Sequence, residues 1–533
     1  MQIVCIGDGV AQRHSPEDVG SKAANLAHMA AIGLPVPPAF VLPVALCDAI
    51  VQRDPRAREH LAEGVMEGIS FLEKATGRLF GDRRRPLLVS VRSGAARSMP
   101  GMLDTVLNVG CTPAAARGLL RMTGHQRFAC DCRRRFLESF GSVVLGLDPA
   151  QFVRRLDGMV AAEGVENAQA LDSEALERLA LAYQEEIEDH HLLADDPMEQ
   201  LRAAAEAVYR SWGSDRATTY RKVEHLEDLR GTAVTVQAMV FGNSGQSSGA
   251  GVAFSRDPST GAAEPVIDVL FDSQGEDVVS GRRNPDTEQV LARRLPEVAA
   301  QLRAALMRLE YEFGDVQDIE FTIEDGKLWI LQTRTAKRTP QAALRFAIDF
   351  VKEGLIAPKE ALRRLDGVNL DRLVSQRLAD TGVALVHGIG ASAGVAVGRA
   401  AFDSANATRL AASGEPVILI RPDTSTADVA GFAASEGIVT VVGARTAHAA
   451  LVARQMGKPC IVGCSELSID LARRSAQLSR MPIKEGDWLS IDGEAGTVYL
   501  GRGKIIEQRP ETELAQIARW RAQPPEAARV RSA

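Results

Sequence analysis

Several residue classes are scarce in this chain, and each scarcity argues against a class of protein. Aromatic residues make up only 5% of the 533 residues, and the formal net charge is −7. The chain therefore has few candidates for base-stacking surfaces and no basic excess for nucleic acid. The apolar stretch 26–46 contains four prolines, Pro35, Pro37, Pro38 and Pro43, so it does not predict a membrane span. We expect neither a nucleic-acid partner nor a membrane partner.

Cysteine is also sparse and unpatterned. The seven cysteines are odd in number and scattered, which predicts neither a disulfide framework nor a zinc site. Cys130 and Cys132 are too close together for the usual zinc spacing. The N-terminus lacks a basic region followed by an apolar one, so no signal peptide is predicted. These features favour a reducing, cytoplasmic location.

The length and the overall composition predict a multidomain globular protein. A chain of 533 residues corresponds to roughly three to four domains. Hydrophobic residues at 45% and charged residues at 25% are typical of globular proteins. Residues 113–225 and 341–380 have helical patterns, whereas 384–507 are rich in Gly, Val and Ala and predict a compact β/α unit.

A histidine stands at a predicted helix start within the segment 437–463. A β-branched run, 437–442, predicts a buried strand, and 449–456 are good helix formers. Thr446 is the candidate N-cap and places His448 in the first helical turn. The helix dipole and the free N–H groups there would stabilise a phosphoryl group on the imidazole. The alternative is a surface or capping histidine.

Other cations in the chain are candidate phosphate ligands. Arg445 and Arg454 flank the histidine and could pair with a phosphate or be solvated. Lys22 lies near a predicted helix start, and Arg92 lies at the polar end of a predicted strand, 86–94. A rigid arginine suits a bidentate phosphate clamp, but a structural ion pair and a solvated lysine are the alternatives.

Two further stretches leave two interpretations open. The segment 242–251 predicts a glycine-rich loop between strands, where backbone N–H groups can approach phosphates, although many hairpins carry glycines. Arg133, Arg134 and Arg135 predict either a docking surface for an anionic partner or a solvated helix face.

A predicted hairpin, 318–334, carries polar residues suited to Mg²⁺–ATP. Asp318 and Glu320 share one strand face, and Gln332 and Arg334 share a face of the next strand. A plain two-residue turn would put Gln332 on the wrong face from Glu320, so we predict a loop of odd length or a bulge at Gly326. The alternative is a surface hairpin of polar residues.

Taken together, these stretches closely resemble the pyruvate, phosphate dikinase family. The matching motifs occur in the family's order over residues 1 to about 520, and they are GSKAANLAHMAAIGLPVPP, PLLVSVRSGAARSMPGMLDTVLN, RSWGSDRA, TVQAMVFGNSGQSSGAGVAFSRDPSTG, QGEDVVSG, DIEFTIEDGKLWILQTR and GARTAHAALVARQMGKPC. The resemblance implies an α/β and α+β multidomain fold. It implies an ATP-grasp nucleotide-binding domain at 1–340 with a helical insertion at about 113–225, a helical linker at 341–383, a swivelling β/α phosphohistidine domain at 384–507, and a short helix and tail at 508–533.

The resemblance also implies roles for individual residues. In the family, ATP phosphorylates a histidine, here His448, inorganic phosphate takes the γ-phosphoryl group, and AMP and pyrophosphate are released. Matched by motif, the residues that contact the nucleotide are Lys22, Arg92, Glu276, Asp277, Asp318 and Arg334. Glu320 and Gln332 match the Mg²⁺ ligands, and Thr446 matches a position that a regulatory kinase can phosphorylate.

The chain also departs from the family. It ends near Trp520, about where the family's pyruvate and phosphoenolpyruvate barrel would begin, so we expect the phosphoryl acceptor on a separate barrel protein. Smaller departures are Ser21 for glycine, Asp268 for glutamate, Ala393 for proline and Ala447 for serine.

We therefore expect an ATP-dependent, cytoplasmic phosphotransferase that phosphorylates its own His448 and passes the group to an acceptor such as pyruvate. A homodimer is a candidate assembly. The alternatives are a non-catalytic phosphocarrier or regulatory ATP-binding protein, which a degraded site at Asp268 would favour, and a pseudo-dikinase that binds ATP without turnover.

Overall fold

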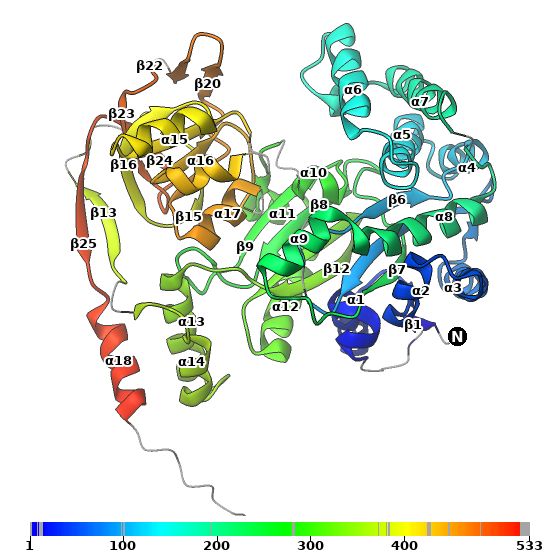
Figure 1. Cartoon of the computed structure of the whole chain (residues 1–533), viewed down its shortest axis with the longest axis horizontal. Helices are drawn as coiled ribbons and strands as arrows, with labels where there is room; N and C mark the ends of the chain where they lie inside the picture. The colour runs from blue at the N-terminus through cyan, green and yellow to red at the C-terminus, as the bar shows by residue number, and fades with distance from the viewer. Residues whose placement is uncertain are drawn as a thin grey trace, which may run out of the picture. The chain divides into compact units, whose positions relative to one another are not determined.

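The computed structural model forms two compact units (Figure 1). It describes residues 3–522 except 8, 10–13, 98, 100–101, 192, 280–282, 371–372, 380, 382–383, 424–427, 446–447 and 480. Unit 1 comprises Met1–Ser248 and Thr322–Thr333, and unit 2 comprises Gly249–Phe321 and Arg334–Ala533. The division passes through two strands, β11 (Gln317–Glu324) and β12 (Lys327–Thr335). The predicted domain limits stay a prediction.

Unit 1 is built on a five-stranded sheet of order β1-β2-β7-β5-β6. Its strands are β1 (Val4–Ile6), β2 (Ala39–Leu42), β5 (Val89–Ala95), β6 (Thr105–Val109) and β7 (Thr232–Ala238), with a separate short pair, β3 (Leu79–Phe80) and β4 (Pro86–Leu87). Val89, Val91, Val234 and Val236 on one face of the sheet are buried in a large apolar core. Alternate positions on β5 and β7 are polar, so the sheet has one apolar and one polar face.

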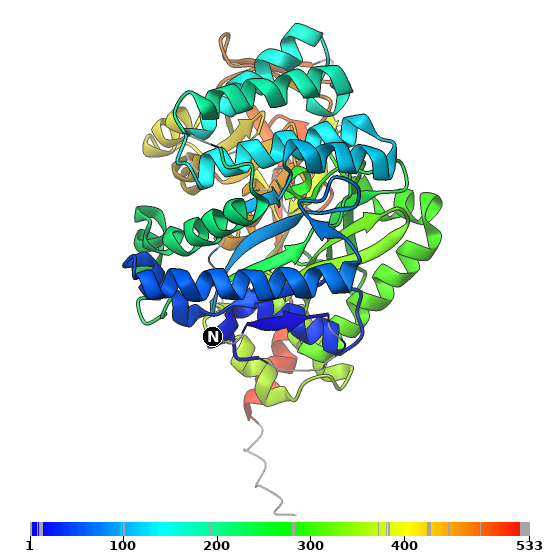
Figure 2. The same ribbon diagram turned by 90° about the vertical axis from the view of Figure 1, so that its right-hand side faces the viewer.

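Helices make up most of the rest of unit 1, as the helical pattern at 113–225 predicts. They are α1 (Pro16–Ala31), α2 (Cys47–Val51), α3 (Pro55–Thr76), α4 (Pro113–Thr123), α5 (Gln126–Val143), α6 (Pro149–Glu163), α7 (Ser173–Glu188), α8 (Pro197–Arg210) and α9 (Asp215–Val223), with 3₁₀ turns η1 (Val44–Leu46), η2 (Ala168–Ala170) and η3 (Ser211–Gly213). Figure 2 shows the helices of the 113–223 segment, coloured cyan to green, grouped together. Their starts follow local chemistry, since Thr112, Asp148 and Asp196 each cap a helix that opens with proline.

Unit 2 begins with strands of a second sheet, of order β10-β9-β8-β11-β12. Its further elements are β8 (Gly249–Phe254), β9 (Val266–Phe271), α10 (Gly275–Val279), β10 (Asp286–Thr287), α11 (Glu288–Arg294) and α12 (Pro296–Phe313). Two helices follow the sheet, α13 (Pro340–Lys352) and α14 (Pro358–Arg364).

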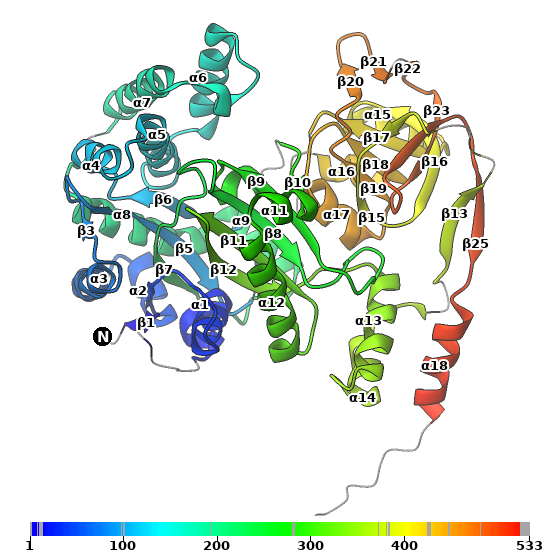
Figure 3. The same cartoon turned by 180° about the vertical axis from the view of Figure 1, so that it is seen from behind.

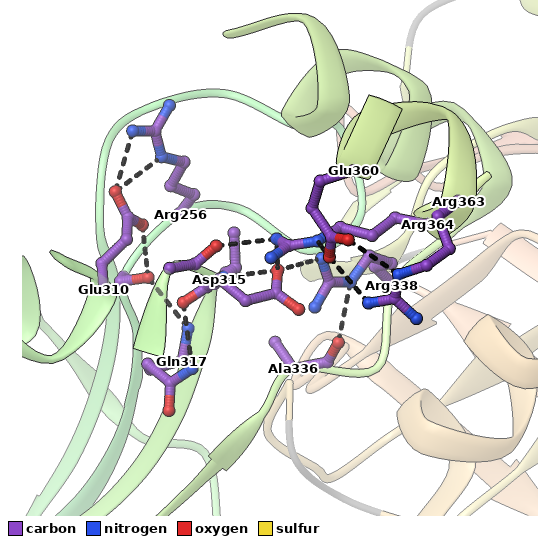
Figure 4. A network of polar contacts seen from close by, with 12 residues as sticks. Arg256, Glu310, Asp315, Gln317, Ala336, Arg338, Glu360, Arg363 and Arg364 are labelled. Atoms are coloured by element: carbon purple, nitrogen blue, oxygen red, sulfur yellow. Dashed lines mark hydrogen bonds and ion pairs between the residues drawn. The ribbon is translucent and has the colours of Figure 1, made fainter. Parts of the chain in front are cut away.

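Charged side chains tie these last helices to the end of the second sheet (Figure 4). Arg256, just after β8, donates to Glu310 of α12 at 3.0 and 2.8 Å. Asp315 accepts a hydrogen bond from Arg338 at 2.6 Å and forms an ion pair with Arg364 of α14 at 3.6 Å. The helices α13 and α14, which the sequence predicts to be a linker, are thus anchored by a polar network within unit 2.

An eight-stranded sheet forms the next part of unit 2, in the order β14-β24-β23-β16-β17-β18-β19-β15. Its strands are β14 (Val386–His387), β15 (Ile389–Ser392), β16 (Val395–Ala401), β17 (Val417–Arg421), β18 (Gly437–Thr440), β19 (Cys460–Val462), β23 (Trp488–Asp492) and β24 (Thr497–Leu500). The strands β16 to β19 are parallel. The helices α15 (Ser404–Ala412), α16 (Val429–Ala434) and α17 (His448–Met456) connect them, as in a β/α unit.

A three-stranded sheet and a two-stranded ribbon complete unit 2. The former contains β20 (Leu467–Asp470), β21 (Ser475–Leu478) and β22 (Met481–Lys484). The latter pairs β13 (Ser375–Ala379) with β25 (Lys504–Gln508), and β25 leads into α18 (Glu511–Ala522), as Figure 3 shows. Ile517 and Trp520 of α18 pack in one apolar cluster with Leu344 and Ala347 of α13.

Candidate functional site

The backbone of the predicted strand–turn–helix places His448 at a helix start. β18 ends at Thr440, and α17 begins at His448. Because β18 is parallel to its neighbours, the histidine follows the carboxyl end of a parallel strand, where α/β sheets bind ligands. The helix ends at Met456, followed by Gly457 at φ 65°, as the sequence predicts. Thr446 lies outside the described residues, so its capping and regulatory roles stay predictions.

Two arginines hold the loop that precedes this helix. The Arg454 guanidinium donates to the carbonyl oxygens of Ala391 and Arg445, both at 2.6 Å. Arg454 is 1% exposed, so the interpretation of it as a solvated side chain was wrong. Arg445 donates its backbone N–H and its Nη1 to Asp268, at 3.0 and 3.1 Å. Burial raises the pKa of the Asp268 carboxyl, although the Arg445 charge opposes that effect. Asp268, which replaces the family's glutamate, thus contacts Arg445, three residues before His448.

Asp318 and Arg334 come together in unit 2. Arg334 Nε donates to Asp318 Oδ2 at 2.8 Å, and the carboxyl is 3% exposed. Its other oxygen, Oδ1, is buried without a hydrogen-bond partner among the described residues. Burial raises the pKa of Asp318, against the lowering effect of Arg334, and Glu320 adds a further negative charge nearby. An unpartnered buried oxygen is able to accept a cation.

The donor types at this place fit Mg²⁺. Asp318 and Glu320 are two positions apart on β11, so their side chains project from one face of the strand. No group of three or more His, Cys, Asp or Glu side chains suited to a metal occurs among the described residues. Two carboxylates with the remaining positions open suit Mg²⁺, which keeps waters and takes phosphate oxygens, better than an all-protein cage.

The hairpin that carries these residues has a different loop from the one predicted. The loop between β11 and β12 consists of Asp325 and Gly326 alone, with φ of 49° and 76°. Two positive φ values make this a two-residue type I′ turn, so the prediction of an odd-length loop or a bulge at Gly326 was wrong. The alternation of burial along β12 breaks further on, because Gln332 and Thr333 are both buried.

In unit 1, Lys22 and Arg92 lie on neighbouring elements, α1 and β5. A Cβ placed on Gly20 would lie 2.0 Å from the Gly94 carbonyl oxygen, so α1 can approach β5 this closely only because Gly20 is a glycine. Gly20 also has a φ of 79°. A Cβ on Gly94 would in turn lie 3.9 Å from Lys22 Cβ. Lys22 and Arg92 are both half-buried, and Arg92 lies in the middle of β5 (Val89–Ala95), so the prediction that it lies at the end of a strand was wrong.

Comparisons with known proteins assign the chain to a family. Residues 56–300 and 295–354 match the family model "Pyruvate phosphate dikinase, AMP/ATP-binding domain", and residues 413–496 match "PEP-utilising enzyme, mobile domain". The two ranges of the first model cover more than half of the chain. The chain belongs to the pyruvate, phosphate dikinase family.

Individual relatives show how far the similarity extends. The chain is 41% identical over 509 residues to "Pyruvate, phosphate dikinase 1, chloroplastic" of Arabidopsis thaliana, covering 94% of this chain and 53% of that protein. It is 42% identical over 518 residues to the pyruvate, phosphate dikinase of Rhizobium meliloti (strain 1021), covering 94% of this chain and 58% of the relative. The chain thus spans about half the length of the curated relatives that it matches. In the described residues, no helix has the length and apolar character needed to cross a membrane.

The remaining residues matched to the pyruvate, phosphate dikinase motifs lie in both units. Glu276 is exposed and Asp277 half-buried in the short helix α10, where Asp277 accepts a hydrogen bond from the Gln274 backbone N–H at 3.0 Å. Gln332 is buried in the part of β12 that belongs to unit 1. Convergence of all the matched residues on one nucleotide stays a prediction.

The structure also shows polar residues that sequence reasoning missed. Thr105 and Thr235 lie opposite Arg92 on the two flanking strands, and the Thr235 hydroxyl is buried without a partner among the described residues. Gln237 lies two positions along from Thr235 on β7. The signal was available, because polar residues alternate with Val and Ala in the run 233–238.

Both interpretations of the arginine triplet in α5 were wrong for its first two members. Arg133 and Arg134 are 6% and 4% exposed, so they form neither a solvated face nor a docking surface. Arg133 donates to the Cys111 carbonyl oxygen at 2.6 Å, and Arg134 binds Asp131 at 2.8 Å. Burial of the helix on two sides, which local pattern does not reveal, accounts for the error.

Proposed function

We propose that this protein is an ATP-dependent phosphotransferase that phosphorylates its own His448. ATP and inorganic phosphate are consumed, AMP and pyrophosphate are released, and the β-phosphoryl group of ATP stays on the histidine. The phosphorus balance closes, because four phosphorus atoms enter and one, two and one leave in AMP, pyrophosphate and phosphohistidine. An acceptor such as pyruvate, bound by a phosphoenolpyruvate/pyruvate barrel, then takes the group.

The unpartnered Oδ1 of Asp318 carries this proposal. A buried carboxylate oxygen without a partner is costly in a folded protein, and bound ligands are a common reason for keeping one. Asp318 and Glu320 would hold Mg²⁺ on the nucleotide phosphates, and Arg334, whose position Asp318 sets, would meet the charge that develops on them. Bound Mg²⁺ would neutralise phosphate charge during transfer.

In unit 1, Lys22 and Arg92 would bind the nucleotide phosphates, with Arg92 projecting from the polar face of β5. Phosphoryl transfer depends on positioning and on charge stabilisation, and fixed cations supply both. At the start of α17, the helix dipole and free N–H groups would stabilise the phosphoryl group on His448. Phosphorylation of Thr446 by a regulatory kinase would add negative charge beside that group.

Position-specific labelling of ATP tests the proposal. With Mg²⁺ and phosphate, [β-³²P]ATP should leave acid-labile label on the protein, and [γ-³²P]ATP should give labelled pyrophosphate instead. H448A should abolish the protein label, whereas H387A, which changes an exposed histidine of β14 in the same unit, should retain it. Protein that binds ATP but takes no label would support the regulatory ATP-binding alternative or a pseudo-dikinase. Addition of pyruvate and a barrel protein to labelled enzyme tests the acceptor.

A further inference from the structure

Asn284 contacts the segment before His448 with both ends of its side-chain amide. The Gly443 backbone N–H donates to Asn284 Oδ1 at 3.3 Å, and Asn284 Nδ2 donates to the Gly463 carbonyl oxygen at 3.4 Å. These two partners are 159 and 179 residues away in the chain. The amide is held in one orientation, because exchanging its oxygen and nitrogen would break both bonds.

The two glycines follow the carboxyl ends of adjacent parallel strands, β18 and β19. Gly443 has a φ of 143°, and Gly463 has a φ of 68°. A Cβ placed on Gly463 would lie 3.0 Å from Asn284 Oδ1 and 3.1 Å from the Gly443 carbonyl oxygen. A side chain at position 463 would therefore crowd the Asn284 amide, and glycine leaves the space that the amide occupies.

The sequence places Asn284 at the edge of the second sheet. It precedes Pro285, which restricts the backbone of the residue before it to extended conformations. The strand β10 begins two residues after Asn284 and pairs with the part of β9 that carries Asp268. Asp268 in turn accepts two hydrogen bonds from Arg445. Two side chains from this edge of the sheet thus contact the segment that leads to His448.

The helix that begins at His448 also lies near the carboxylates of β11. The Arg454 guanidinium of α17 lies 5.6 Å from the centre of the Phe254 ring on β8. Burial raises the pKa of Asp318, and the charges of Arg334 and, more weakly, Arg454 oppose that rise. The histidine helix and the proposed Mg²⁺ site are therefore neighbours within unit 2.

We propose that Asn284 is a positioning residue that holds Gly443, and with it the segment leading to His448, in place for phosphoryl transfer. This inference rests on the proposed function. Phosphoryl transfer requires the attacking and leaving atoms to be nearly in line, so a small displacement of the histidine slows the reaction. Asn284 acts through the backbone of Gly443 and does not touch the nucleotide. Its loss should slow the transfer step without weakening nucleotide binding.

The variant N284A tests the inference, because it removes both hydrogen bonds by truncating an exposed side chain. At saturating Mg²⁺–ATP, labelling of His448 by [β-³²P]ATP should slow about 3- to 10-fold, as loss of one or two hydrogen bonds implies. The Kd for ATP, measured by calorimetric titration of the full chain, should be unchanged. N284D keeps the acceptor for Gly443 but sets a second acceptor against the Gly463 carbonyl oxygen, so it should label more slowly than N284A. The matched control N167A truncates an exposed asparagine that caps the 3₁₀ turn η2, and it should label normally.

Hydrogen exchange gives a readout that does not depend on activity. The Gly443 amide loses its acceptor in N284A, so it should exchange faster than in the wild type, in the absence of nucleotide. Exchange is measured by mass spectrometry of peptides that contain Gly443. N167A should leave the exchange of these peptides unchanged.

Each outcome supports or overturns the inference. Labelling of N284A at the wild-type rate would overturn it, and so would unchanged exchange at Gly443, which would show that the contact is not made in solution. Slower labelling with an equal loss of ATP affinity would also overturn it, because it would indicate general damage to the nucleotide site. Wild-type protein that takes no label on His448 would overturn the proposed function first, and this inference with it.

Discussion

Asp131 in unit 1 and Asp318 in unit 2 are both buried aspartates beside arginine, yet their surroundings differ. Asp131 is 5% exposed and Asp318 is 3% exposed. Both oxygens of Asp131 accept hydrogen bonds, and two guanidinium groups lower its pKa. Asp318 has one arginine on one oxygen, its second oxygen is unpartnered, and burial raises its pKa. The number of cationic donors, and not burial, separates a structural carboxylate from one that is able to bind a cation.

The largest expected effect is on stability, at Asp131. The variant D131A removes one of the two carboxylates that pair with the 5% exposed Arg134 side chain and leaves only Glu138, at 2.6 Å. Removing one partner of a buried pair costs about 3–5 kcal/mol, and the remaining pair with Glu138 places the expected cost toward the lower end. We expect the unfolding transition of unit 1 to shift strongly in urea denaturation followed by circular dichroism. The control D318A removes the other carboxylate and should shift its transition much less. Equal shifts in the two variants would contradict the comparison.

The next effect is on activity, at Asp318. D318N keeps the shape of the side chain but removes the charge that would hold Mg²⁺. Because metal ions supply several kcal/mol of charge stabilisation in phosphoryl transfer, labelling of His448 should slow by about 100-fold or more. The rate is measured by quenched-flow labelling with [β-³²P]ATP, with unfolding followed in parallel. A variant that labels at the wild-type rate would show that Oδ1 does not bind the metal.

Arg334 should show an intermediate effect. R334K keeps a positive charge but replaces the planar fork, so the alignment with Asp318 Oδ2 is lost. We expect the labelling rate to fall by about 10-fold, less than in D318N, with a small change in ATP affinity. The matched substitution R134K, beside Asp131, should reduce stability and leave the labelling rate of the folded protein nearly unchanged. The opposite pattern would reverse the roles of the two carboxylates.

The smallest effect concerns pH. The pKa of Asp318 is higher in the folded protein than in the unfolded chain. As pH rises above about 4, the Asp318 carboxyl therefore ionises in the unfolded chain before it ionises in the folded protein. Over that pH range the wild type should lose stability relative to D318N, until the folded carboxyl also ionises. For Asp131 the pH dependence has the opposite sign, because its pKa is lower in the folded protein than in the unfolded chain. The stability that ionised Asp131 contributes is lost only as pH falls below the ordinary aspartate pKa of about 4. Thermal unfolding in metal-free buffer from about pH 2 to about pH 7 checks both signs, with D131A as the reference for Asp131. A stability difference between wild type and D318N that stays constant with pH would contradict the first.

Local pattern predicted the elements around the candidate site well. The strand before His448, the helix that begins at it and the glycine after Met456 all follow from short-range propensity and capping. The strands of the hairpin were also predicted, but the prediction for its turn was wrong. That prediction rested on the assumption that Gln332 and Glu320 share one face of the hairpin. The dipeptide Asp325–Gly326 indicates a two-residue turn on local grounds alone.

The motifs and their order were enough to assign the family and the types of chemical group available, since a histidine, cations and carboxylates can be read directly from residue identity. Their partners depended on contacts between distant segments. Arg134, Arg454 and Asp318 are charged residues that local pattern assigns to the surface, and each is buried. Burial depends on which elements pack together, and those elements can be a hundred or more residues apart in the chain. The same packing gives both oxygens of Asp131 hydrogen-bond donors and leaves Asp318 Oδ1 without one among the described residues.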